Sequence, residues 1–178
     1  MARRKTIVPL VVDTNVCVVS NRREGDPIEW ASKCANQLHL ITKSGILVID
    51  SQDVIFSEYK RYLSFRGEPG AGDRFFKWLV DNRYREDRVH LTTVTFDEDR
   101  PGNFEEFPED PELVTFHLKD RVFVAVALSH PQTPAIVNAV DSDYWHHRVA
   151  LVRNGVTILN ICGTEHFKPA EQAGRGIT

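Results

Sequence analysis

Cysteine is scarce in this chain: there are three, Cys17, Cys34 and Cys162, an odd number with no CxxC pair. Their number and spacing argue against a disulfide framework and a zinc ribbon, and favour a reducing compartment such as the cytoplasm. Long hydrophobic runs are also missing, because no apolar stretch approaches the roughly 20 residues of a membrane-spanning helix. The first residues show no cleavage-site pattern, so we expect neither a membrane protein nor a signal peptide.

The residues that are abundant fit one globular domain. Of the 178 residues, 42% are hydrophobic and 26% are charged, which allows a sizeable core. We expect a single domain over 1–178, with its core at about 6–167 and a frayed C-terminal tail. The net charge of −3 is unevenly distributed, because residues 97–112, here called the acidic segment, hold eight acids and one arginine. We interpret the acidic segment as a loop with a helical turn.

Short apolar runs alternate with amphipathic stretches along the chain. The expected strands are 6–12, 46–50, 89–96, 135–140 and 156–161, and the expected helices are 28–44, 52–66, 73–86, 118–130 and 141–151. We expect Asp26 to cap the helix at 28–44 and Ser51 to cap the helix that follows it. Alternating strands and helices predict an α/β fold, a parallel twisted sheet with helices on both faces.

Four acids occupy positions that such a fold brings together. Asp13 and Asp141 each follow an apolar strand, and ligands of open parallel sheets bind beyond the carboxyl ends of the strands. Asp120 begins the apolar helix at 118–130, and Glu58 lies within the helix at 52–66. Two carboxylates ~5 Å apart repel by about 3 kcal/mol at an effective dielectric constant near 20. A hard divalent cation relieves such repulsion, and carboxylate clusters suit Mg²⁺ or Mn²⁺.

The segments that carry these acids resemble a known family. "VVDTNV", "VIFSEY", "KDRVFVAVAL" and "VNAVDSDYW" are similar, in this order, to the motifs of the PIN-domain family of metal-dependent ribonucleases, from Val11 to about Phe167. The resemblance implies a PIN-like fold. It also implies catalytic and metal-binding roles for Asp13, Glu58, Asp120 and Asp141, an outer metal-binding role for Asp143, and supporting roles for Asn15 and Thr14. The chain departs from the family at Ala139, where members often carry Thr or Ser.

The expected activity is that of an endoribonuclease. One or two bound Mg²⁺ or Mn²⁺ ions would activate water and stabilise charge on the attacking and leaving oxygens. Basic residues interleaved with aromatic ones predict RNA contacts on the stretch 74–85, from Arg74, Lys77, Arg83 and Arg85. Because small members of the family occur in toxin–antitoxin pairs, an inhibitory antitoxin-like protein and a homodimer are expected partners.

Two other functions are considered. A haloacid-dehalogenase-like phosphatase would use Asp13 as its nucleophile, but that chemistry requires a second acid two residues later, where this chain has Asn15. A non-catalytic RNA-binding or assembly module with a PIN-like fold stays open as the alternative to the nuclease.

Overall fold

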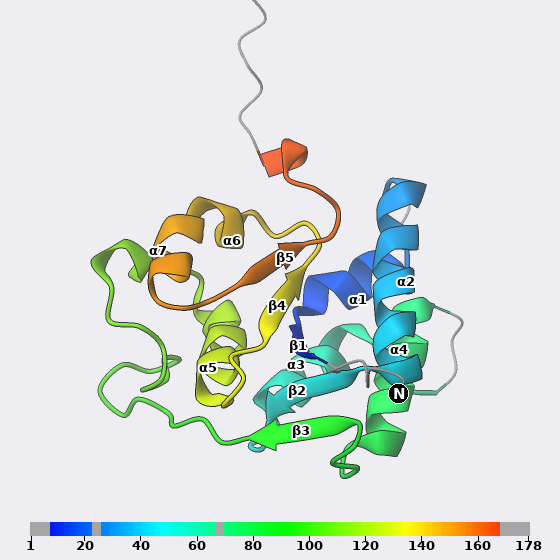
Figure 1. Cartoon of the computed structure of the whole chain (residues 1–178), viewed down its shortest axis with the longest axis horizontal. Coiled ribbons are helices and arrows are strands. Elements are labelled where there is room, and N and C mark those ends of the chain that lie inside the picture. The colour runs from blue at the N-terminus through cyan, green and yellow to red at the C-terminus, as the bar shows by residue number, and fades with distance from the viewer. Residues whose placement is uncertain (1–7, 23–25, 67–69, 168–178) are drawn as a thin grey trace, which may run out of the picture.

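The computed structural model describes residues 8–22, 26–66 and 70–167. Its centre is a five-stranded, all-parallel sheet with the order β3-β2-β1-β4-β5 (Figure 1). The strands are β1 (Pro9–Val12), β2 (Ile46–Asp50), β3 (Val89–Thr92), β4 (Ala135–Asn138) and β5 (Ile158–Asn160). The predicted α/β fold with a parallel sheet is confirmed, and it is consistent with a PIN-like fold. Residues 6 and 7 of the first predicted strand and the predicted frayed tail lie outside the described residues.

The central strands are covered on both faces. Val11 and Val12 of β1 are fully buried, and so are the consecutive residues Leu47, Val48 and Ile49 of β2. Because successive side chains of a strand point to opposite faces, both faces of these strands face protein rather than water. Unbroken apolar runs were therefore a sound signal for buried parallel strands.

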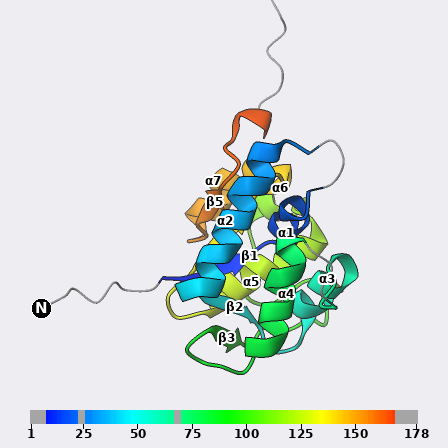
Figure 2. The same ribbon diagram turned by 90° about the vertical axis from the view of Figure 1, so that its right-hand side faces the viewer.

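Seven α-helices occur in the described ranges, and Figure 2 shows them from the side. They are α1 (Thr14–Ser20), α2 (Ile28–Ser44), α3 (Val54–Tyr62), α4 (Ala71–Asn82), α5 (Arg121–Ser129), α6 (Ser142–His146) and α7 (Arg148–Arg153). Helix α1 is missing from the sequence prediction, because its seven residues continue the β-branched, apolar composition of β1. The predicted helix at 141–151 is two helices, α6 and α7, which meet at His147.

Two predicted helix caps are wrong. Pro27, not Asp26, is the residue at the cap position of α2, and Pro27 makes no side-chain cap hydrogen bond. The N-terminus of α3 is capped by Asp50 rather than Ser51, since the Asp50 carboxylate accepts from the backbone N–H groups of Val54 and Ile55, at 2.8 Å each. Asp50 ends β2 and is fully buried, so this cap fixes α3 directly to the carboxyl end of that strand.

The sheet order creates a switch point between β1 and β4. From β1 the chain goes to β2 and then β3 on one side, and it returns to the other side of β1 with β4 (Figure 1). Ligands of open parallel sheets bind beyond the carboxyl ends of the strands at such a point. Asp13 follows β1 and Asp141 follows β4, so the two acids flank the switch point.

Helices in the described part of the chain are too short or too polar to cross a membrane.

Candidate active site

A cleft of about 530 Å³ opens at the carboxyl ends of β1 and β4. All five predicted acids line it, together with the two predicted supporting residues: Asp13, Glu58, Asp120, Asp141, Asp143, Thr14 and Asn15. These residues come from four separate parts of the sequence: the start of α1, the middle of α3, the start of α5 and the start of α6. The cleft is thus a product of the fold and not of one continuous segment.

Asp13 is the most deeply buried acid of the cleft, with 3% of its surface exposed. Its Oδ1 accepts from the backbone N–H of Asn15 at 2.8 Å, which caps α1, and also from the Asn15 side chain. Its Oδ2 accepts from the hydroxyl of Tyr144 at 2.8 Å. Burial raises the pKa of Asp13 to about 6, and the charge of Asp141 adds to the increase, although the hydrogen bonds from Asn15 and Tyr144 oppose it.

Three asparagines join the ends of β1, β4 and β5 beneath the cleft. The Asn15 amide donates to Asn138 Oδ1 at 2.9 Å and accepts from the backbone N–H of Ala139 at 2.8 Å. The Asn138 amide donates to Asn160 Oδ1 at 2.8 Å and to the carbonyl of Asp141 at 2.9 Å. Asn138 is fully buried, and its polar atoms are satisfied within this network. The network fixes the position of Asp13 relative to Asp141.

Asp120 stands at the N-terminus of α5, after a short 3₁₀ turn (Leu118–Asp120). Burial raises its pKa to about 8, and the charges of four neighbouring acids raise it further; in order of effect these are Asp13, Asp141, Asp143 and Glu58. The negative charges of all four other acids in the cleft therefore raise the pKa of the Asp120 carboxyl group. At neutral pH, Asp120 therefore retains a proton in much of the metal-free protein.

Arg121 holds the start of α5 in place. This arginine is buried, and its guanidinium donates to the carbonyl of Val114 at 2.8 Å, to the carbonyl of Phe116 at 3.1 Å and to Asn103 Oδ1 at 3.2 Å. It also lies over the ring of Phe107, 4.6 Å from the centroid. Because the next residue along the helix is Arg121, these contacts fix the backbone at Asp120.

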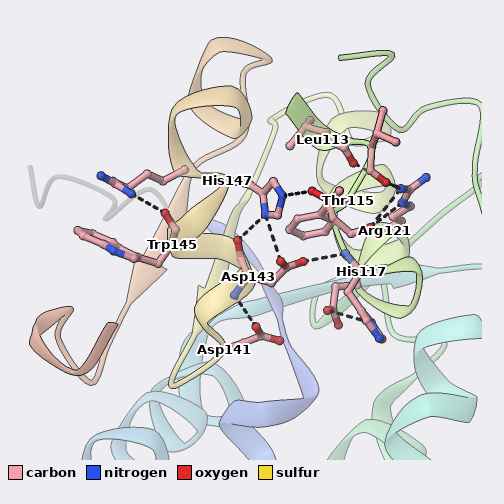
Figure 3. Close-up of polar contacts among 12 residues, drawn as sticks. Leu113, Thr115, His117, Arg121, Asp141, Asp143, Trp145 and His147 are labelled. Carbon is pink, nitrogen blue, oxygen red and sulfur yellow. Dashed lines mark hydrogen bonds and ion pairs between the residues drawn. The ribbon is translucent and has the colours of Figure 1, made fainter. Parts of the chain in front are cut away.

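Asp141 and Asp143 lie on the first turn of α6 (Figure 3). Asp141 Oδ1 accepts from the backbone N–H of Asp143 at 2.8 Å and so caps the helix. Asp143 Oδ2 accepts from the backbone N–H of His117 at 2.7 Å, and its Oδ1 lies 3.1 Å from Nδ1 of His147. Asp143 therefore connects α6 to the segment before Asp120, while Asp141 keeps its second carboxylate oxygen available to the cleft.

Glu58 reaches the cleft from α3. Its neighbour Tyr59 is fully buried and donates a hydrogen bond to the carbonyl of Val12, directly before Asp13. This contact fixes α3 at the end of β1 and directs Glu58 to the cleft, where 16% of its side chain is exposed. Glu58 also forms an ion pair with Arg61 at 3.2 Å.

The acids of the cleft supply oxygen donors, and His117 in the wall of the cleft lies 3.5 Å from Asp120 Oδ2. Besides the carboxylates, the buried hydroxyl of Thr14 lacks a hydrogen-bond partner among the described residues. Oxygen ligands of this kind fit a hard divalent cation. In the described part of the chain, however, no three His, Cys, Asp or Glu side chains converge closely enough to form a ready-made metal site. Asp143 and Glu58 are held by other partners, as described above.

Several residues of the cleft were not identified from the sequence. Tyr144 and Asn138 support Asp13 from below, and the cleft wall also includes Val18, Tyr62, Thr115, His117 and Lys119. The polar residues Asn138 and Tyr144, close to Asp141 in "VNAVDSDY", were the available signal. Their partners at the end of β1, Asn15 and Asp13, are 123 and 131 residues away in the sequence, so these contacts depend on the register of β1 and β4.

The four basic residues predicted to contact RNA do not line this cleft. Lys77 pairs with Asp81, Arg83 with Asp53 and Arg85 with Asp87. Arg74 lines a different cavity, between α2 and α4, beside Trp78. The structure thus places this stretch apart from the acids, and RNA contacts there stay a prediction.

We compared the chain with models of protein families, with curated proteins and with solved structures, and none of the three comparisons found a match.

Proposed function

We propose that this protein is a divalent-metal-dependent endoribonuclease of the PIN-domain type. The observation that carries the proposal is the convergence of Asp13, Glu58, Asp120, Asp141 and Asp143 on one cleft at the switch point of the sheet. The order of the four motifs and the parallel α/β fold support it. So do the carboxylate oxygens of the cleft, which suit Mg²⁺ or Mn²⁺.

Different residues of the cleft would have different roles in phosphodiester hydrolysis. An ion held by Asp13, Asp120 and Asp141 would lower the pKa of water and stabilise charge on the phosphate. Asn15 and Tyr144 hold both oxygens of Asp13, so this carboxylate is fixed before substrate arrives. Burial and neighbouring charges raise the pKa of Asp120 to about 8, so this group must lose its proton before it can serve as a ligand. In this mechanism, no side chain forms a covalent intermediate.

Cleavage of single-stranded RNA tests the proposal. Wild-type protein should cut a labelled RNA in millimolar Mn²⁺ and should be inactive in EDTA. Asp120→Asn should reduce the rate at least 100-fold, because it removes a ligand charge with little change in volume. The control is Asp81→Asn, which alters an exposed carboxylate paired with Lys77 on α4 and should retain activity. RNA binding without any cleavage in Mn²⁺ would instead favour the binding module.

Location and partners are further parts of the proposal. Cys17, Cys34 and Cys162 are all buried and free, and the sulfurs of Cys34 and Cys162 are 3.8 Å apart without a bond. Free cysteines are in keeping with a cytoplasmic protein. An inhibitory protein partner and a second copy of this chain stay predictions, to be checked by co-purification and by light scattering.

A further inference from the structure

A second, smaller cavity continues from the acidic cleft. Its volume is about 290 Å³, and it shares Glu58 and Lys119 with the cleft. The rest of its wall is mainly apolar and comes from α3, from residues 96–104, from the turn before α5 and from α5: Val54, Ser57, Arg61, Phe96, Gly102, Phe104, Leu118 and Val122. We call it the side pocket. A mainly apolar space therefore adjoins the acidic cleft.

Two large apolar side chains of the side pocket are left open to solvent. Phe96 is 53% exposed and Leu118 is 51% exposed, whereas Phe104, which contacts Phe96 with ring centroids 5.3 Å apart, is buried. Phe104 thus supports the Phe96 ring from one side. Gly102 adopts φ +82°, a conformation that favours glycine, and its lack of a side chain keeps the pocket open beside Leu118.

Two basic residues line the side pocket, Arg61 and Lys119. The Arg61 side chain is 64% exposed and pairs with Glu58 at 3.2 Å, and Lys119 forms no ion pair with the residues described by the structure. Lys119 also lines the cleft, so this cation lies where the two cavities adjoin. An aromatic surface on one side and cations at the entrance are the combination that binds single-stranded nucleic acid, with bases on the rings and phosphates at the cations.

We propose that the side pocket binds one unstacked nucleobase of single-stranded RNA, stacked on Phe96, next to the phosphate in the acidic cleft. This inference rests on the proposed function, since it assigns the neighbouring phosphate to the cleft. The small volume suits a single planar group. An unstacked base is available in a single strand and not in a duplex, so the pocket selects single-stranded substrate.

The test measures binding separately from cleavage. The probe is a fluorescein-labelled octauridylate RNA in millimolar Ca²⁺, which satisfies carboxylate oxygens but is less exacting than Mg²⁺ in its geometry. Phe96→Ala should weaken binding by about 5- to 20-fold, at the lower end of what a lost base stack costs. Phe96→Trp should bind as wild type does, and Phe96→Leu should be as weak as Phe96→Ala, because leucine has no π face.

The matched control is Phe65→Ala. Phe65 follows α3, is 42% exposed and lines neither the cleft nor the side pocket, so it is an accessible aromatic residue apart from both cavities. This variant should bind the octamer as wild type does. A blunt-ended RNA duplex of the same length as the octamer offers no unpaired base, so it should bind equally to wild type and to Phe96→Ala.

The outcomes separate this inference from the nuclease. Equal affinity of wild type and Phe96→Ala overturns the side pocket as a base site, and RNA cleavage in Mn²⁺ would then leave the nuclease intact. Phe96-dependent binding without cleavage overturns the nuclease and retains the base site, whereas absence of any binding by wild type overturns the base site. If Phe96→Leu binds as tightly as wild type, the pocket recognises apolar surface and not bases, and the inference fails.

Discussion

Two regions of this protein are rich in acids, and their chemistry is opposite. In the cleft, Asp13, Asp120 and Asp141 form no ion pair with lysine or arginine in the residues that the structure describes, and the pKa values of Asp13 and Asp120 are raised. In the acidic segment, Arg100 pairs with Asp97 and Glu109, while Arg153 pairs with Asp110 and Glu112. A hydrogen bond from Arg153 lowers the pKa of Asp110.

The comparison shows that the density of acids in a sequence says little about function. The acidic segment has the higher density, yet four of its eight carboxylates pair with Arg100 or Arg153 and hold the segment in place. The cleft gathers acids that are scattered along the chain and leaves them facing one another, at a cost to the metal-free protein. Uncompensated carboxylates at the ends of parallel strands are therefore the more informative feature.

The largest effect should come from breaking the connection between the two regions. Arg121 joins α5 to Asn103 of the acidic segment and to the carbonyls of Leu113, Val114 and Phe116, which follow that segment. Arg121→Ala leaves these buried acceptors without a donor, so the free energy of unfolding should fall by about 3 kcal/mol. Urea denaturation of wild type and Arg121→Ala measures this difference in the free energy of unfolding. A loss below 0.5 kcal/mol would show that the arginine is not structural.

The next effect concerns the raised pKa of Asp120. A group whose folded-state pKa is above its unfolded value contributes stability at low pH that is lost as the pH rises through the folded pKa, here from about 4 to about 8. In EDTA, the wild type should thus become less stable across this range. Asp120→Asn removes the charge and should be more stable than wild type at pH 9, by on the order of 2 kcal/mol, with no gain at pH 4. Thermal melts at both pH values check this, and a variant that is less stable at pH 9 would contradict it.

A smaller effect of opposite sign is expected in the acidic segment. Asp110 accepts hydrogen bonds from Arg153 at 2.6 Å and from Asn154 at 2.7 Å, and it caps the turn that begins at Pro111. Because its pKa is lowered, its stabilising effect is present above the unfolded pKa and is lost as the pH falls. Asp110→Asn should lower the melting temperature at pH 7 and have little effect at pH 3. A higher melting temperature of Asp110→Asn than of wild type at pH 7 would contradict the contrast between the cleft and the acidic segment.

The sequence predicted the acids of the cleft better than it predicted what surrounds them. The first strand is apolar up to its last residues, Val11 and Val12. Asp13 could therefore be recognised as a carboxylate that is costly to bury and that stands where ligands of parallel sheets bind. Helix α1 was missed because its composition matches that of the strand before it. The network of Asn15, Asn138 and Asn160 could not be derived, because it depends on which strands are neighbours and in which register. The hydrogen bond from the His117 backbone to Asp143 could not be derived either, because it depends on how two segments 26 residues apart meet in the fold.

The most direct test of the account is whether a divalent cation stabilises the folded protein through the cleft. Millimolar Mn²⁺ should raise the melting temperature of wild type over its value in EDTA by about 3–8 °C, since an ion that binds only the folded state stabilises it. Asp120→Asn should lose most of this increase, and Asp110→Asn should keep it. Identical melting curves of the wild type in Mn²⁺ and in EDTA would contradict the metal site and, with it, the proposed nuclease.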